Sequence, residues 1–350
     1  MSAPAAPAVA DSAGRAQLQR LFSPRHIAVF GGASAAEAVR QCRKLGFAGQ
    51  IWPVHPTRAS VEGLACYPDV ASLPQAPDAS FVAVPRHATV DIVGQLAARG
   101  AGGVICYASG FAEVGGEGVA LQQQLVHNAG EMALLGPNCY GMLNYLDGAA
   151  PWPDQHGGQR VERGVALITQ SGNIGLNLTM QRRALPLAYL ITVGNKAGSS
   201  MESLVDALLA DPRVSVIGMH IEGLDDVAAF SRVALKALRQ GVPLVALKAG
   251  RSAISCFSSS VSSSPLSTVR LTVSRPALRL IASGVPTGGG SISADTATPD
   301  CDRSMMRQRW MAPSAMVTVV WALGGMKRGW TRFTMSASTA RWWSPIFSAK

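Results

Sequence analysis

Two short turns in this chain place glycine and serine directly after an apolar segment and directly before a helix-forming one. Residues 31–34 read Gly-Gly-Ala-Ser, and residues 170–173 read Gln-Ser-Gly-Asn. A turn between a strand and a helix presents free backbone N–H groups, and the helix dipole adds partial positive charge. Each turn is therefore a candidate phosphate or oxyanion site; the alternatives are a plain glycine turn for the first and a structural cap for the second.

The residues around the two turns argue against NAD binding at the first turn and against a serine hydrolase at the second. The first turn lacks the third glycine of a dinucleotide fingerprint, and residues 55–57, His-Pro-Thr, end the second strand without a ribose-binding acid. NAD is therefore disfavoured, whereas a nucleotide phosphate is not. The second turn is not a serine hydrolase elbow, because Thr169 and Asn173 occupy the positions that need glycine.

Short apolar strands alternate with helical segments on both sides of residue 150, and this pattern predicts parallel sheets wound on both faces. We expect α/β architecture throughout: a Rossmann-like doubly wound domain, then a second α/β domain, then an irregular tail. The expected parts are a disordered N-terminus (1–20), a first domain (21–150), a second domain (151–252) and a basic tail rich in Ser and Trp (253–350).

The composition changes abruptly near residue 252. Residues 253–350 hold 11 Lys and Arg against three Asp and no Glu, and they hold five of the seven Trp. Most of the formal charge of +10 therefore belongs to the tail and is not a nucleic-acid or membrane signal. The tail is a disordered extension, an unrecognised domain or a frame-shifted reading of the gene, and we favour the frame shift as a hypothesis.

Cysteine usage and the N-terminus bear on the compartment. The six Cys show no CxxC spacing, so neither a zinc site nor a disulfide framework is indicated. The first residues lack the basic start and apolar core of a signal peptide, and no apolar run is long enough to span a membrane. We expect a cytoplasmic protein with no metal site and no membrane association. A nucleic-acid binder that acts through the basic tail is disfavoured.

Further motifs complete a pattern in the first domain. Val84-Pro85 ends one strand, residues 109–113 read Ser-Gly-Phe-Ala-Glu, and residues 136–141 read Gly-Pro-Asn-Cys-Tyr-Gly. Their order resembles the CoA-binding domain of the NDP-forming (ADP-forming) acyl-CoA synthetases, relatives of the succinyl-CoA synthetase α subunit. The resemblance implies CoA contacts at Gly32, Ala33, Ser34, Pro56, Val84, Pro85, Ser109, Gly110 and Asn138. One expected cation for a CoA phosphate is absent, because the family often has Asn-Pro-Lys at residues 55–57.

The resemblance continues through residues 164–173, 190–195, 214–223 and 243–251, which are similar to the ligase domain that follows in the same family. It implies a flavodoxin-like fold for the second domain. It implies that Ser171 and Gly172 bind a phosphoryl group. It also implies that Glu222 contacts a phosphohistidine, although a solvated strand end is the alternative. We expect Cys139, in its Gly-Pro turn, to be structural rather than a nucleophile.

The histidine that receives the phosphoryl group in this family follows the strand at residues 243–251, and no histidine follows Arg251 here. His220 is a poor substitute, because we expect it to be a packed core residue. An ATP-grasp region is not recognisable either. ATP and Mg²⁺ would therefore act only through a missing ATP-grasp portion or a β-type partner subunit.

The resemblance thus implies the CoA-binding portion of an acid–CoA ligase that is incomplete in this chain. The full reaction makes acyl-CoA from a carboxylic acid, CoA and ATP through an acyl phosphate and a phosphohistidine. Whether this chain is itself an enzyme stays open, as does the acid. The alternatives are a non-catalytic CoA-binding or regulatory protein and an NAD(P)-linked Rossmann dehydrogenase.

Overall fold

The computed structural model describes residues 12–181, 184–222, 224 and 226–248, and the backbone of four later strands. The chain divides into two units, residues 1–259 and 260–350. In the second unit, β13 (Thr268–Ser274) pairs antiparallel with β14 (Ala277–Ser283), and β15 (Val317–Val320) pairs antiparallel with β16 (Arg332–Met335). Most of residues 253–350 lie outside the described residues, so the hypotheses of a disordered extension, an unrecognised domain or a frame shift are not tested.

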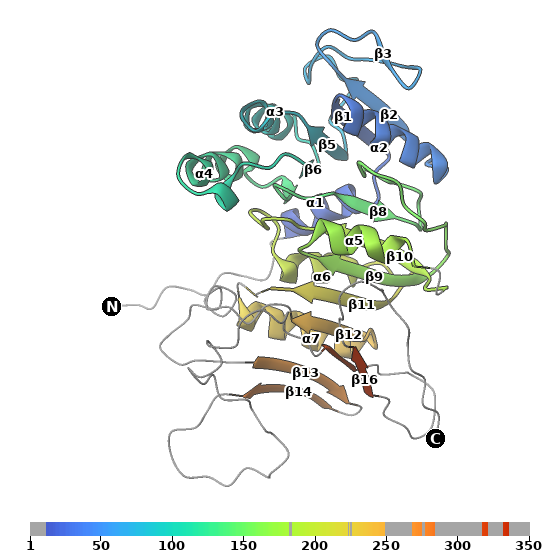
Figure 1. The fold of residues 1–350 in the computed structure, drawn as a ribbon, viewed down its shortest axis with the longest axis vertical. Helices are drawn as coiled ribbons and strands as arrows, with labels where there is room; N and C mark the ends of the chain where they lie inside the picture. The colour runs from blue at the N-terminus through green and yellow to red at the C-terminus, as the bar shows by residue number, and fades with distance from the viewer. Residues whose placement is uncertain are drawn as a thin grey trace, which may run out of the picture. The chain divides into compact units, whose positions relative to one another are not determined.

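The first sheet of unit 1 has five strands, all parallel, in the order β2-β1-β5-β6-β7 (Figure 1). They are β1 (His26–Gly31), β2 (Gln50–Val54), β5 (Ala79–Ala83), β6 (Gly103–Cys106) and β7 (Ala133–Leu135). A short hairpin of β3 (Ser60–Val61) and β4 (Leu64–Ala65) follows β2.

Helices cover both faces of this sheet. They are α1 (Ser12–Phe22), α2 (Ala33–Lys44), α3 (Arg86–Ala98) and α4 (Glu117–Ala129). The core on one face joins Ala28 and Val82 of the sheet to Val93 of α3 and Leu125 of α4. The strand order reverses direction after β2. Right-handed crossovers therefore put α2 on the face of the sheet opposite to α3 and α4, as predicted for a doubly wound domain.

The N-terminal segment corrects one expectation. Residues 12–22 form α1, although residues 1–20 were expected to be disordered. The reason is apolar spacing: Leu18, Leu21 and Phe22 fall on one side of a helix and are buried. Glycine at position 103 leaves room for this helix, because a Cβ there would lie 2.9 Å from the Cβ of Leu21.

The second sheet has the order β12-β11-β9-β10-β8. Four strands are parallel: β9 (Gly164–Thr169), β10 (Leu187–Thr192), β11 (Val214–Ile221) and β12 (Leu244–Lys248). The edge strand β8 (Met142–Asn144) is antiparallel to β10. The helices are α5 (Gly172–Thr179), α6 (Met201–Leu208) and α7 (Val227–Gln240). The predicted α/β class, with parallel sheets in both domains, is confirmed.

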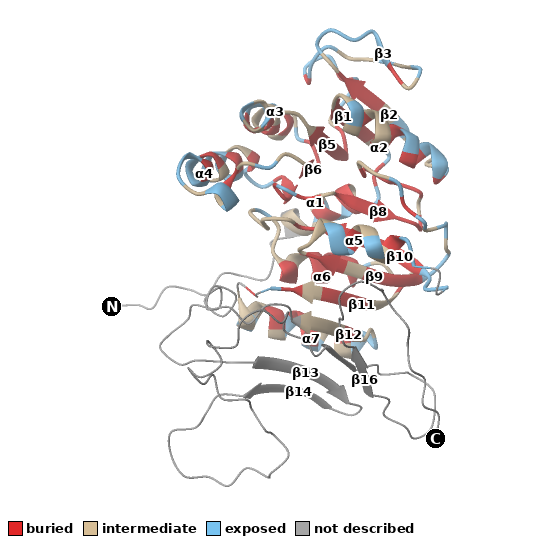
Figure 2. Ribbon diagram, in the orientation of Figure 1, coloured by how far each residue is buried: buried red, intermediate tan, exposed pale blue. Residues whose placement is uncertain are grey.

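Burial follows this layered arrangement, with strands largely buried and the outer faces of helices exposed (Figure 2). Because the strand order reverses after β10, right-handed crossovers place α5 on one face and α6 with α7 on the other. In both sheets the parallel strands therefore end at a common carboxyl edge, where the following turns lie together. No helix within the described ranges is long and apolar enough to cross a membrane.

Candidate functional site

The turn after β1 is shaped by two glycines with different roles. Gly31 has a φ of +127°, and a Cβ at this position would lie 2.3 Å from the carbonyl oxygen of Ala83 on β5. Only glycine lets β1 end this close to its neighbour. Gly32 caps α2 without a side-chain hydrogen bond, and a Cβ there would meet nothing within 4 Å. There is therefore open space beside Gly32 at the N-terminus of α2, the end of a helix that favours anions.

The structure brings the residues assigned to CoA to one edge of the first sheet. Each lies in the turn that follows a parallel strand or, for Ala33 and Ser34, at the start of the helix that follows it, and none is buried. They are Gly32, Ala33 and Ser34 after β1, Pro56 after β2, Val84 and Pro85 after β5, Ser109 and Gly110 after β6, and Asn138 after β7. Their role in binding CoA remains a prediction.

The loop after β6 is held by the side chains of Arg86, Glu113 and Asn195, to which the sequence analysis assigned no role. Arg86 donates a hydrogen bond of 2.7 Å to the Gly110 carbonyl oxygen and one of 3.0 Å to Glu117. The Gly110 N–H donates to Glu113 at 2.6 Å, and Asn195 of the second domain donates to the same carboxylate at 2.5 Å. The only sequence signal for these contacts was the three-residue spacing of Gly110 and Glu113.

Glu113 is ionised in this arrangement. Partial burial by itself raises the pKa of its carboxyl, but the hydrogen bonds from Asn195 and from the Gly110 N–H outweigh burial and lower the pKa. The carboxylate therefore links the loop after β6 to the second domain at neutral pH.

The loop after β7 contains Asn138 and Cys139. Asn138 has a φ of +58°, and its N–H donates to the carbonyl oxygen of Ala108 at 2.9 Å. Cys139 is 2% exposed, and burial raises the pKa of its thiol to about 12. Its sulfur lies 3.6 Å from the carbonyl oxygen of Cys106. A neutral, enclosed thiol is a poor nucleophile, so the structural role predicted for Cys139 is supported.

The second predicted turn begins α5. The Ser171 hydroxyl accepts a hydrogen bond of 3.3 Å from the Ile174 N–H, so it caps the helix. Glu222 follows β11, the neighbour of β9; its side chain is exposed, and its N–H donates to the Gln170 side chain. The structure thus brings Ser171, Gly172 and Glu222 to the same edge of the second sheet, and their roles remain predictions.

His220 lies beside this turn and departs from expectation. Its ring is half-buried at the end of β11 rather than enclosed in the core, and Nδ1 lies 3.3 Å from the Thr169 hydroxyl. Burial lowers the pKa of the imidazole, and the nearby Glu222 charge opposes this. The strand pairing of His220 with Thr169 explains the position, because Thr169 is the last residue of β9 and His220 is the last but one of β11.

The two groups of turns are fastened to each other. The Gly141 N–H donates to the Thr192 hydroxyl at 2.8 Å, and the Asn195 N–H donates to the Pro137 carbonyl at 2.9 Å. The ring of Tyr140 packs on Gly172, where a Cβ would lie 2.3 Å from Cδ2. The loop that carries Asn138 therefore contacts the first residue of α5, so the predicted CoA and phosphate turns adjoin.

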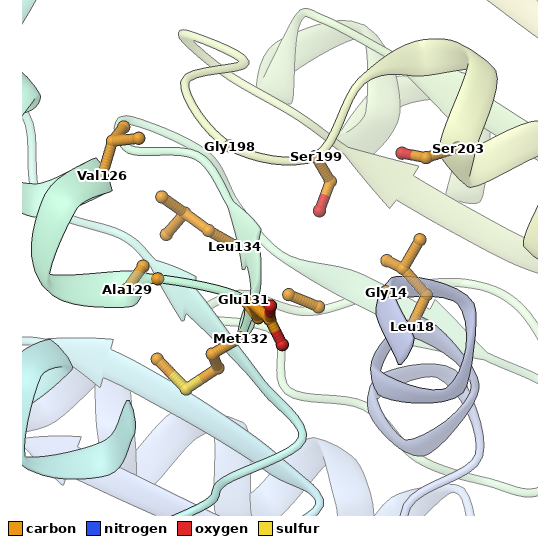
Figure 3. A pocket seen from close by; sticks show the side chains of 12 residues that line it. Gly14, Leu18, Val126, Ala129, Glu131, Met132, Leu134, Gly198, Ser199 and Ser203 are labelled. Atoms are coloured by element: carbon orange, nitrogen blue, oxygen red, sulfur yellow. The ribbon is translucent and has the colours of Figure 1, made fainter. Parts of the chain in front are cut away.

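A separate hollow lies between α1, the turn before β7 and the start of α6 (Figure 3). Its walls include Leu18, Met132, Leu134 and Ser199, and its volume is about 210 Å³. It contains none of the predicted site residues and is smaller than most ligand sites. Among the described residues, no group of three or more His, Cys, Asp or Glu side chains is placed to hold a metal ion.

Two protein-family models match this chain. Residues 25–145 match a CoA binding domain, and residues 162–265 match a succinyl-CoA ligase like flavodoxin domain. The last part of the second match lies outside the described residues.

Curated relatives cover the same region. A trans-feruloyl-CoA synthase from an unknown prokaryotic organism is 36% identical over 248 residues, which are 67% of this chain and 35% of that protein. The α subunit of an ADP-forming acetate–CoA ligase II of Pyrococcus furiosus is 29% identical over 67% of this chain and 52% of the subunit. The chain spans about a third to a half of the length of these relatives.

Solved structures give the same result. The apo form of a dinucleotide forming acetyl-coenzyme A synthetase 1 from Ca. Korarchaeum cryptofilum has a TM-score of 0.63 and 29% identity. The match covers 71% of this chain and 56% of that chain. The same protein in complex with phosphate and ADP also gives a TM-score of 0.63, at 28% identity.

Proposed function

We propose that this chain, whose two sheets are the CoA-binding domain and the flavodoxin-like ligase domain of the NDP-forming acyl-CoA synthetase family, is the CoA-binding portion of an acid–CoA ligase. The full reaction joins a carboxylic acid to CoA and converts ATP to ADP and phosphate. In its last step the CoA sulfur bonds to the acyl carbon of an acyl phosphate, and phosphate leaves.

The observation that carries this proposal is the contact between the loop after β7 and the start of α5, made by Tyr140 and Gly172. Acyl transfer requires the CoA thiol and the acyl phosphate to meet within a few ångströms. A CoA held by the turns of the first sheet can reach a phosphoryl group at Ser171 and Gly172, because the two loops adjoin. The open turn at Gly32 takes the CoA phosphates, and the α5 N-terminus stabilises phosphoryl charge.

Glu222 is assigned to holding the histidine that carries the phosphoryl group. That histidine is not among the six in this sequence that precede Arg251, and none follows. We therefore assign ATP and Mg²⁺ binding to an ATP-grasp portion or a β-type subunit outside this chain. The isolated chain should bind CoA and should not form ADP.

Calorimetric titration of the full chain with CoA tests the proposal, with NADH as the control ligand. Saturable CoA binding without NADH binding supports it, and NADH binding in preference to CoA supports the dehydrogenase alternative. ADP formation from ATP, CoA and any carboxylic acid by the isolated chain would contradict the assignment of catalysis to a missing portion.

A non-catalytic CoA-binding protein is the second candidate, favoured by the lack of a histidine after Arg251. The two candidates differ in their response to an ATP-grasp subunit of this family. If CoA binds but acyl-CoA never forms when such a subunit, ATP and a panel of acids are supplied, the binding function is the better assignment.

A further inference from the structure

A row of aromatic rings runs from Phe81 on β5 of the first sheet to Trp152, which follows β8 of the second sheet. The Phe81 and Tyr107 ring centroids are 6.0 Å apart, and those of Tyr107 and Tyr140 are 6.1 Å apart with the rings nearly perpendicular. Tyr140 is followed by Trp152 at 5.2 Å. The two end members are buried, whereas the two tyrosines are half-buried.

The two half-buried rings stand between the two groups of turns. Tyr107 directly follows β6 and lies two residues before Ser109. Tyr140 lies two residues after Asn138, and its ring rests on Gly172 at the start of α5. One side of the pair is therefore next to the predicted CoA loops, and the other is next to the predicted phosphate turn.

The hydroxyl groups of these tyrosines are uncommitted within the described residues, since no hydrogen bond involves either of them. Burial raises the pKa of Tyr140, and the neighbouring Tyr107 raises it further, so the phenol stays neutral at physiological pH. Neither hydroxyl is a buried atom without a partner, so both are accessible to solvent or to a ligand. Two rings with free hydroxyls can pack against an aromatic group and hydrogen-bond to its substituents.

We propose that the acid handled at this site is aromatic, and that its ring packs against Tyr140 and Tyr107 during transfer. This inference rests on the proposed function. The acyl carbon must lie where the CoA sulfur and the phosphoryl group meet, which is next to Gly172 and hence next to the Tyr140 ring. The group attached to that carbon then lies over the tyrosine pair. An acetyl group would leave most of both rings uncovered.

The test compares the affinities of the full chain for benzoyl-CoA, cyclohexanecarbonyl-CoA and acetyl-CoA, measured by calorimetry. These are stable products of the reaction, so binding is measured without turnover. We expect benzoyl-CoA to bind about fivefold more tightly than acetyl-CoA, from the usual strength of an aromatic pair. Cyclohexanecarbonyl-CoA, similar in size but not aromatic, should fall between them.

Variants assign the preference to the tyrosines. Tyr140→Leu should reduce the ratio of benzoyl-CoA to acetyl-CoA affinity to below twofold, and Tyr140→Phe should retain most of it. Tyr67→Leu, a half-buried tyrosine beside β2, is the matched control and should retain the full ratio. Thermal unfolding of each variant confirms that it folds. Both affinities in the ratio are measured on the same variant, so a general loss of CoA affinity cancels.

Three outcomes overturn the inference. Equal affinity for benzoyl-CoA and acetyl-CoA in a wild-type chain that binds CoA rejects it and leaves the proposed function standing. A preference that survives in both Tyr140→Leu and Tyr107→Leu also rejects it. Absence of binding to CoA itself rejects the proposed function, and this inference with it.

Discussion

The aromatic ring of Tyr140 lies directly against the backbone of Gly172. A Cβ built on Gly172 would be 2.3 Å from Cδ2 of the ring, a separation that real atoms do not adopt. Tyr140 belongs to the loop after β7 of the first sheet. Gly172 is the first residue of α5, the helix that follows β9 of the second sheet. Glycine at position 172 therefore determines how closely the two predicted halves of the site approach.

Gly172→Ala should destabilise the protein by about 2 kcal/mol, because the ring or the start of α5 must shift to admit a methyl group. Gly32→Ala is the matched control, since a Cβ there meets nothing within 4 Å and the change should cost less than about 1 kcal/mol. Denaturant unfolding measures both values. Equal stability of the two variants would show that the Tyr140 contact does not restrain α5.

The contact that joins Glu113 to Asn195 gives a second prediction. The 2.5 Å hydrogen bond between them and the 2.6 Å bond from the Gly110 N–H fix the loop after β6 against the second domain. Replacing either side chain by alanine should destabilise the protein, and the double variant should lose less than the sum. We expect a coupling energy of about 1 kcal/mol in a double-mutant cycle. Additive losses would mean that the contact does not form in solution.

The sequence predicted the alternation of strands and helices, because each strand is a short apolar run and each turn carries glycine, proline or asparagine. It placed Gly32, Ser109 and Asn138 correctly at strand ends, since parallel strands put these turns at one edge. It did not predict the partners of those turns. Arg86 and Glu113 act across 24 and three residues respectively, and such pairings depend on how the loops fold.

Contacts between the two sheets could not be predicted from the sequence either. The packing of Tyr140 on Gly172 joins positions 32 residues apart in different sheets, and no local pattern records it. His220 was assigned to the core because it lies within a strand, yet it is the last residue but one of that strand and is half-buried. Strand pairing sets that exposure, and the register is a property of the assembled sheet.

The free energy of unfolding should fall at low pH because of ion pairs at the amino ends of the parallel strands in the second sheet. Arg213 donates to Asp147 at 2.7 Å and to Asp211 at 2.8 Å. Burial alone raises the pKa of each carboxyl, but the hydrogen bonds from Arg213 outweigh it and hold both pKa values low. The folded values lie below the unfolded value of about 3.9, so this stability is complete above that pH and is lost as pH falls.

Arg213→Gln should therefore lower the free energy of unfolding at pH 7 by about 1 kcal/mol, a modest value because the side chain is 38% exposed. Between pH 5 and about pH 2 its stability should fall less steeply than that of the wild type. Arg232→Gln, an exposed arginine on α7, is the control and should keep the wild-type slope. Parallel slopes for all three proteins would exclude Arg213 as the source of the pH dependence.

Cysteine reactivity should separate Cys66 from the other described thiols. Cys42, Cys106 and Cys139 are buried, and burial raises the pKa of each, to about 12 for Cys42 and Cys139. Cys66 is more accessible, and the Arg58 charge partly offsets the effect of burial on its pKa. In a Cys256→Ser, Cys301→Ser background, one thiol should react with a disulfide reagent before unfolding and three only after it. Rapid loss of a second thiol would indicate that the core opens.

Thr57, in the turn after β2, occupies the position where the family often has a lysine. Arg58 is the next residue and carries the positive charge that Thr57 lacks. The turn is fixed by His55, whose Nδ1 accepts hydrogen bonds of 3.2 Å from the N–H groups of Thr57 and Arg58. Within the described residues, no hydrogen bond or ion pair involves the Arg58 guanidinium, whereas Arg40 nearby is paired with Glu62 at 2.5 Å. In dinucleotide-binding folds an arginine near the end of this strand accommodates a ribose phosphate.

CoA carries a ribose phosphate that dephospho-CoA lacks, so the affinity ratio of these ligands reports on Arg58. We expect Arg58→Ala to lower that ratio about tenfold, the effect of losing one charge-assisted hydrogen-bonded contact. Thr57→Lys should raise it, and Arg232→Ala, which removes the same charge from α7, should leave it unchanged. Calorimetry at two salt concentrations measures the ratio. If Arg58→Ala binds CoA with the wild-type preference over dephospho-CoA, another group neutralises the phosphate.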